Sequence, residues 1–175
     1  MGACVALELA LGRPDLVGKL VLVSGQCGGR EAIPMEPGVW AALSDKSGTA
    51  ADVANRMFSV LFPPEWLAAH DPWEYCPEVH ETTSVESAAR QAAAFSSWTG
   101  CYDRLPGIRA PTLILTGTED IVVPPENSVM LWRRIPGSKV VSFRGAGHGL
   151  MYQDPAGVAA SVIAFLEPGP APDPA

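Results

Sequence analysis

Three short apolar runs along the chain predict buried β-strands. They cover Lys19–Ser24, Thr112–Thr116 and Lys139–Phe143, and each is rich in Val, Leu or Ile. Continuous apolar runs of this length are typical of strands in a parallel sheet that helices cover on both faces. Helical patterns lie between and around the runs, so the sequence predicts an α/β fold with crossover connections.

Helical segments are predicted at both ends of the chain and between the second and third runs. The opening segment is apolar on nearly every side and stops at Gly12-Arg13-Pro14, which predicts a fully buried helix. Another helix is predicted over Glu126–Ile135. The last begins at Asp154-Pro155, a cap followed by a first-turn proline. Its inward face carries apolar residues at helical spacing, namely Val158, Val162 and Phe165.

The stretch from 26 to 105 differs from the rest because it adds no strand. Two capping-box signatures, Thr49–Asp52 and Thr83–Glu86, predict helix starts within it. Tryptophans stand among its prolines and glycines. We therefore predict a helical insertion, or lid, that covers the carboxyl-terminal edge of the sheet.

These patterns together predict a partial α/β domain. Residues 1–25 would form a helix and the first strand of the core, and residues 26–105 the helical lid. Residues 106–167 would complete the core with the other two strands, and the Pro- and Ala-rich residues 168–175 would be a disordered tail.

Composition narrows the choice of partners. The chain has 12 Lys and Arg against 19 Asp and Glu, a net charge of -7, which disfavours nucleic acid and anionic membrane as partners. No segment reaches membrane-spanning length. The four cysteines are widely spaced and form no Cys-x-x-Cys pair, which favours a reduced, cytoplasmic protein over a disulfide framework or a metal site.

Candidate chemistry follows the second and third runs. Glu119 and Asp120 come after one strand, and His148 follows the next within Gly145–Gly149. The carboxyl ends of parallel strands share one edge, where ligands bind in open sheets. A carboxylate there can hold one imidazole nitrogen while the other faces a substrate.

With these loops in view, the chain resembles the α/β-hydrolase superfamily over almost its whole length. Met1–Ala6 is similar to the residues after the serine of a Gly-x-Ser-x-Gly nucleophile elbow, Pro111–Pro124 to the acid loop, and Gly145–Leu150 to the histidine loop. The resemblance implies that Asp120 is the triad acid, His148 the general base, and Met1 a backbone donor of the oxyanion hole. It implies no cofactor and no metal.

The resemblance also implies an activity on a small molecule, an ester, thioester or lactone. Two alternatives exist on the same fold. One is a dehalogenase or epoxide hydrolase, which would use an aspartate nucleophile, and the other is a cofactor-free haloperoxidase. No Gly-x-Ser precedes Met1 in the printed sequence, so we expect a truncated chain that is inactive by itself. The alternative from another class is a non-catalytic remnant or partner-binding half-domain that self-associates through the exposed edge of the Lys19–Ser24 strand.

Other residues allow more than one interpretation. Glu119 is a rival to Asp120, whereas Ser24–Gly28 offers no carboxylate after the first strand. Three tryptophans, Trp40, Trp66 and Trp98, would line a substrate pocket, but packing between lid helices explains them equally well. A metal set of His70, Asp71, Glu74, Cys76 and His80 is disfavoured, because prolines between them prevent one regular helix from aligning the ligands.

Overall fold

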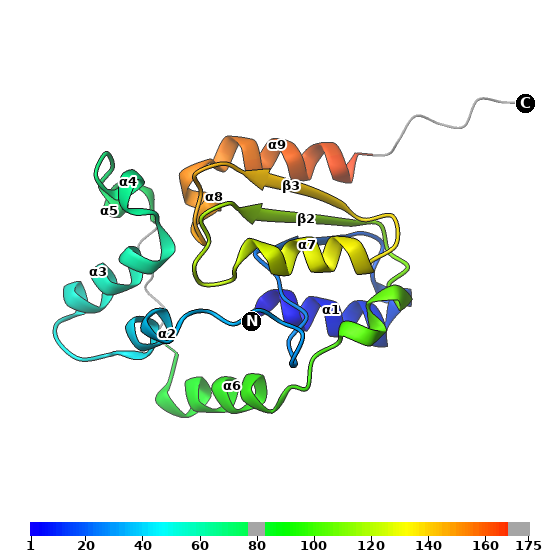
Figure 1. Ribbon diagram of the computed structural model, residues 1–175, viewed down its shortest axis with the longest axis horizontal. Coiled ribbons are helices and arrows are strands. Elements are labelled where there is room, and N and C mark those ends of the chain that lie inside the picture. Colours follow the sequence, from blue (N-terminus) through cyan, green and yellow to red (C-terminus); the bar gives the residue numbers. More distant parts are fainter. Residues whose placement is uncertain (77–82, 168–175) are drawn as a thin grey trace, which may run out of the picture.

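The computed structural model describes residues 1–76 and 83–167. Within these residues, β1 (Leu20–Val23), β2 (Thr112–Gly117) and β3 (Lys139–Phe143) form a parallel sheet in the order β1-β2-β3 (Figure 1). The three apolar runs are therefore confirmed as strands, to within a residue at each end. Because neighbours in the sheet are neighbours in sequence, the loops after β2 and β3 leave the sheet side by side.

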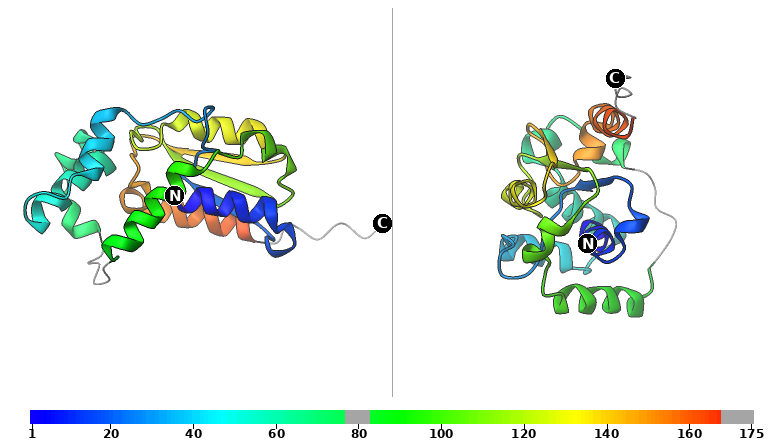
Figure 2. Two further views of the ribbon diagram at one scale, coloured as in Figure 1. Left: turned by 90° about the horizontal axis from the view of Figure 1, so that it is seen from below. Right: turned by 90° about the vertical axis from the view of Figure 1, so that its right-hand side faces the viewer.

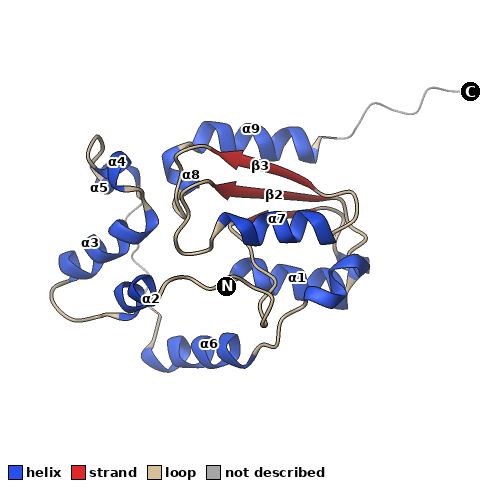
Figure 3. Cartoon of the chain, in the orientation of Figure 1, coloured by secondary structure: helices blue, strands red, loops and turns tan. Residues whose placement is uncertain are grey.

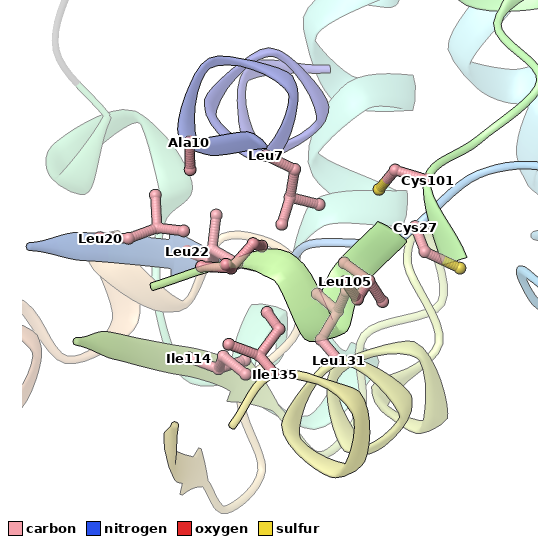
Figure 4. Close-up of a cluster of buried hydrophobic side chains, with 11 residues drawn as sticks. Leu7, Ala10, Leu20, Leu22, Cys27, Cys101, Leu105, Ile114, Leu131 and Ile135 are labelled. Carbon is pink, nitrogen blue, oxygen red and sulfur yellow. The ribbon is translucent and has the colours of Figure 1, made fainter. Parts of the chain in front are cut away.

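Helices cover both faces of this sheet. On one face α1 (Gly2–Gly12) and α7 (Pro125–Arg134) enclose the larger core, whose side chains are drawn in Figure 4. On the other face lies α9 (Pro155–Leu166) (Figure 2). The inward face predicted for α9 is confirmed, since Val158, Val162 and Phe165 pack against the second core cluster. These two layers hold the strand ends at a fixed spacing.

The prediction that the opening helix is fully buried is wrong. Only one stripe of α1 is buried, with Cys4, Leu7 and Ala10 facing the sheet. On the outer side Val5 is 64% exposed and Leu9 47% exposed. A helix on a sheet makes contact along one stripe only. On the outer side Ala94 and Phe95 lie across an open pocket from Val5 without covering it.

The stretch between β1 and β2 is helical in its described part, as predicted. The 3-10 turn η1 precedes β1, and η2 precedes β2. Helices α2 to α5 lie beyond the arrowheads of the strands, whereas α6 crosses near the start of α1 (Figures 2 and 3). Their bounds are η1 Pro14–Leu16, α2 Pro37–Ser44, α3 Ala50–Leu61, α4 Pro64–Leu67, α5 Pro72–Tyr75, α6 Val85–Ser97 and η2 Tyr102–Gly107, followed after β3 by α8 Leu150–Gln153. None of the described helices combines the length and the apolar character that crossing a membrane requires.

Helix caps show where local sequence signals succeed. The capping box of α3 is complete, because Asp52 N donates to Thr49 Oγ1 at 3.2 Å and Thr49 N donates to Asp52 Oδ2 at 2.8 Å. The second predicted box is wrong by one residue. The cap of α6 is Ser84, whose hydroxyl accepts a bond from Ser87 N, and a serine at that position cannot return the bond as a glutamate would.

Candidate active site

The loops after β2 and β3 are bonded to each other at the carboxyl-terminal edge of the sheet. Thr118 N donates to Phe143 O at 3.0 Å, Glu119 N donates to Ala146 O at 2.9 Å, and Gly145 N donates to Thr118 Oγ1 at 2.9 Å. A side chain at Gly117 would overlap the carbonyl of Ala146, so the close approach of the two loops needs glycine there. The acid loop and the histidine loop thus form one unit.

Within this unit the structure brings Asp120 and His148 together. His148 Nδ1 lies 2.9 Å from Asp120 Oδ2, in position to donate to it. The other carboxylate oxygen, Oδ1, accepts bonds from the backbone nitrogens of Val122 (2.9 Å) and Val123 (2.7 Å). The Asp120 side chain is fully buried, so these three donors replace the water that a carboxylate otherwise needs.

The imidazole keeps access to solvent. The His148 side chain is 30% exposed, and Nδ1 makes the only hydrogen bond of the ring among the described residues. A carboxylate at Nδ1 fixes the proton there, which leaves Nε2 as the basic nitrogen. Glu119, the rival acid, has an exposed side chain and no hydrogen bond to His148. The geometry therefore favours Asp120 as the partner of the histidine.

Two supports of the histidine loop were not foreseen from the sequence. Gln153, at the end of α8, accepts a bond from Gly147 N at 2.8 Å and donates from Nε2 to Gly145 O at 3.3 Å. On the opposite side, Gly149 N donates to Leu61 O at 2.9 Å. A side chain at Gly149 would overlap the buried ring of Phe62. The sequence offered little indication of these two contacts, because neither Gln153 nor Phe62 belongs to a recognised motif together with the loop residues.

Met1 lies at the start of α1, at the end of the sheet where the strands have their carboxyl ends (Figure 1). The start of α1 packs on the end of β1, where a Cβ at Gly25 would lie 3.2 Å from the Cβ of Ala3. Met1 makes no hydrogen bond to Asp120 or His148 within the described residues. Its role in an oxyanion hole stays a prediction.

The three tryptophans have different surroundings. Trp66 stacks on Phe62, at 4.6 Å between ring centroids, and on His70, at 4.5 Å. Trp98 Nε1 donates to Glu8 Oε1 of α1 at 2.7 Å. Trp40 is 56% exposed. Only Trp66 is linked to the histidine loop, through Phe62, and a substrate-binding role for any of the three stays a prediction.

Metal and thiol chemistry find little support among the described residues. Across residues 1–76 and 83–167 no three His, Cys, Asp or Glu side chains converge as metal ligands, and His80 lies outside these ranges. Burial raises the pKa of Cys101 to about 12 and also raises the pKa values of Cys4 and Cys27. A thiol nucleophile needs a lowered pKa, so these three cysteines are poor candidates.

Comparison with known proteins agrees with the observed fold. The sequence profile of the alpha/beta hydrolase family matches residues 1–161. The chain therefore belongs to the α/β-hydrolase family.

Individual relatives are more distant. The chain is 28% identical over 170 residues to RutD of Klebsiella pneumoniae, which is provisionally named a carbamate hydrolase. The aligned region covers 88% of this chain and 58% of that protein. It is also 28% identical to the 2-hydroxy-6-oxononadienedioate/2-hydroxy-6-oxononatrienedioate hydrolase 2 of Pseudomonas putida, covering 95% of this chain and 60% of that protein. The chain thus spans about 58–60% of the length of these two curated relatives.

Solved structures show the same fold. An enol-lactonase from Burkholderia xenovorans superposes with a TM-score of 0.74 at 21% identity, covering 95% of this chain and 62% of that one. A thermophilic esterase from Thermogutta terrifontis gives a TM-score of 0.72 at 25% identity, covering 94% and 61%.

Proposed function

We propose that Asp120 and His148 are the acid and the general base of a serine-type hydrolase that acts on a small molecule. The bond would be an ester, thioester or lactone, or a related acyl bond such as a carbamate. The single observation that carries the proposal is the pairing of His148 Nδ1 with the buried carboxylate of Asp120 at the sheet edge. The names of the relatives, which include a lactonase, an esterase and a carbamate hydrolase, support this class of substrate.

In the proposed mechanism a serine hydroxyl attacks the carbonyl carbon. His148 Nε2 takes the serine proton and passes it to the leaving group, while Asp120 holds the imidazole and stabilises its charged form. Water then attacks the acyl-enzyme by the same route, releasing the acid and regenerating the serine. Backbone N–H groups hold the oxyanion, and the start of α1, where Met1 lies, is the positive end of a helix dipole.

The serine would precede Met1, as the resemblance of Met1–Ala6 to the end of a nucleophile elbow implies. Loss of the nucleophile of such a triad lowers turnover on the order of a million-fold. We therefore expect the 175-residue chain by itself to lack family turnover. A cytoplasmic location is part of the proposal, supported by four free cysteines.

The experiment begins with the coding sequence upstream of Met1, where an in-frame Gly-x-Ser is expected. A chain extended through that serine should react with a serine-directed phosphonate probe, and His148→Ala should abolish the reaction. His70→Ala is the matched control, because His70 stacks on Trp66 and does not contact Asp120. Undiminished labelling of His148→Ala would show that the base is wrongly assigned.

A second candidate, a self-associating half-domain, is favoured by the free edge of β1. Leu20 N donates to Pro111 O, directly before β2, and Ser24 N donates to Leu115 O of β2. By alternation the backbone of Val21 and Val23 faces outward, where no described strand pairs with it. The β1 strands of two copies could pair in antiparallel fashion, with the two-fold axis at Leu22. Val21 of each copy would then lie opposite Val23 of the other, and the two strands would form four hydrogen bonds.

Helix α1 packs next to β1, so its exposed apolar residues Val5 and Leu9 would add to such a contact. Sedimentation equilibrium of the 175-residue chain should then show a dimer that a Val5→Lys, Leu9→Lys variant dissociates. Trp132→Lys, an exposed residue of α7, serves as the control and should leave the dimer intact. A monomer at every concentration would refute the second candidate.

A further inference from the structure

Gln153 holds the histidine loop from the side of α8. We propose that Gln153 is a positioning residue, which keeps His148 directed at Asp120 by bridging the two glycines that precede it. The assignment rests on the proposed role of His148 as the base. It adds to that role a residue outside the triad, which acts only through the backbone of the loop.

The bridge uses both ends of one side-chain amide. Oε1 of Gln153 accepts the bond from Gly147 N at 2.8 Å, and Nε2 donates to Gly145 O at 3.3 Å. A planar amide carries an acceptor and donors side by side, which matches a peptide N–H and a C=O two residues apart. No charged side chain and no hydroxyl offers both groups in this arrangement.

The loop needs such a support because three of its five residues, Gly145, Gly147 and Gly149, are glycines. Glycine loses more conformational freedom on folding than any other residue, so a glycine loop stays ordered only where other groups hold it. Gly147 is buried, and Gln153 is the partner of its N–H. Without Gln153 this buried donor would be unpaired, which favours rotation of the peptide that leads directly into His148.

The other supports of the loop do not replace Gln153. Thr118 holds Gly145 N, and Glu119 N holds Ala146 O, both on the side of the acid loop. Leu61 O holds Gly149 N, after the histidine. The residue directly before His148 depends on Gln153 alone among the described side chains. Loss of Gln153 should therefore loosen the bond from His148 Nδ1 to Asp120 while most of the loop remains attached.

The test measures that bond directly in the 175-residue chain, without requiring activity. With ¹⁵N-labelled histidine, the Nδ1 proton of His148 is assigned by its loss in His148→Gln, and its exchange with water is measured by NMR. In Gln153→Ala we expect exchange roughly tenfold faster, the size of one lost buried hydrogen bond. Gln153→Glu keeps the acceptor for Gly147 N and loses the donor to Gly145 O, so exchange should be intermediate.

The matched control is Asp154→Ala. Asp154 is adjacent to Gln153 and caps α9 by accepting the bond from Gly157 N at 2.8 Å, without contacting the loop. The control should lower the melting temperature and leave the Nδ1 exchange of His148 unchanged. If Gln153→Ala does not fold, Gln153→Glu carries the test, with exchange faster than in the wild type.

The outcomes separate this inference from the proposed function. Wild-type exchange rates in both Gln153 variants would overturn the positioning role alone. A wild-type chain with no protected Nδ1 proton on His148 would overturn both, since the bond to Asp120 would be absent. Failure of phosphonate labelling in the extended chain, together with accelerated exchange in Gln153→Ala, would leave the positioning of His148 standing and refute the serine mechanism.

Discussion

Replacing Gly149 with alanine tests whether Phe62, at the end of α3, holds the histidine loop. The backbone of Gly149 has φ −81° and ψ 24°, a conformation open to any L-residue, so alanine meets no backbone strain. Its methyl group would instead overlap Cε1 of the Phe62 ring. The effect of Gly149→Ala should therefore come from packing alone.

The magnitude follows from two opposing terms. Alanine in place of glycine at a compatible position stabilises by about 0.4–1 kcal/mol, because the unfolded chain has less freedom. Overpacking of a close-packed site costs about 1–3 kcal/mol. Phe62 cannot move aside freely, since it is 2% exposed and stacked on Trp66. The overpacking term should dominate, and we expect a net loss of about 1–2 kcal/mol.

Urea unfolding followed by tryptophan fluorescence measures this loss. In a Phe62→Leu background, which removes the ring from Gly149, the same Gly149→Ala change should cost little, a coupling of about 1 kcal/mol or more. Gly38→Ala is the control. A Cβ at Gly38 in α2 meets nothing within 4 Å, so this variant should be as stable as the wild type or slightly more stable.

Equal destabilisation of the two backgrounds by Gly149→Ala would refute the reasoning, because the obstruction would then lie elsewhere than in Phe62. A neutral effect in the wild-type background would refute it as well. Either result would remove the contact through which α3 is expected to hold the loop.

Three further predictions concern the acid, the thiols and an ion pair. Asp120→Asn in the extended chain should lower kcat on an ester by about ten-thousandfold, because the amide cannot hold the required tautomer; a small loss would argue against Asp120. In a titration of the native protein with Ellman's reagent, the partly exposed Cys76 should react well before Cys101, because burial raises the pKa of Cys101 to about 12. Comparable reaction rates would contradict the burial of Cys101. The hydrogen bond from Arg104 lowers the pKa of Glu8 below 4.5. The ion pair therefore stabilises the fold above pH 4.5, and this contribution is lost as the pH falls through the lowered pKa. The melting temperature of Glu8→Gln should therefore fall less than that of the wild type as the pH is lowered. An identical fall in both proteins would exclude the ion pair as a source of the pH dependence.

Much of the architecture could be predicted from local sequence. The strands were predictable because a strand buried on both faces needs a continuous apolar run, and such a run is visible in a few consecutive residues. The cap of α9 was predictable because it too is local: Asp154 accepts a hydrogen bond from a backbone nitrogen only three residues away. Asp120 and His148 could be named because both follow strands and their order matches a known pattern.

Tertiary structure decided what depends on neighbours distant in sequence. The composition of α1 predicted burial on all sides, yet which sides are buried depends on what packs there, and Val5 and Leu9 remain exposed. The family resemblance favoured Asp120 over its neighbour Glu119, but the contact itself, with Asp120 against His148 and Glu119 exposed, appears only in the folded chain.

The support of the histidine loop by Phe62 belongs to the same class, whereas Gln153 lies only 6 and 8 positions from the glycines that it bonds. Phe62 precedes Gly149 by 87 positions, and Gln153 follows His148 in a helix of four residues, so neither lies in a repeating pattern. A sequence pattern records which side chains a segment offers within a few residues. Which of them meet across the molecule is set by the packing of whole strands and helices, and only the folded chain contains that information.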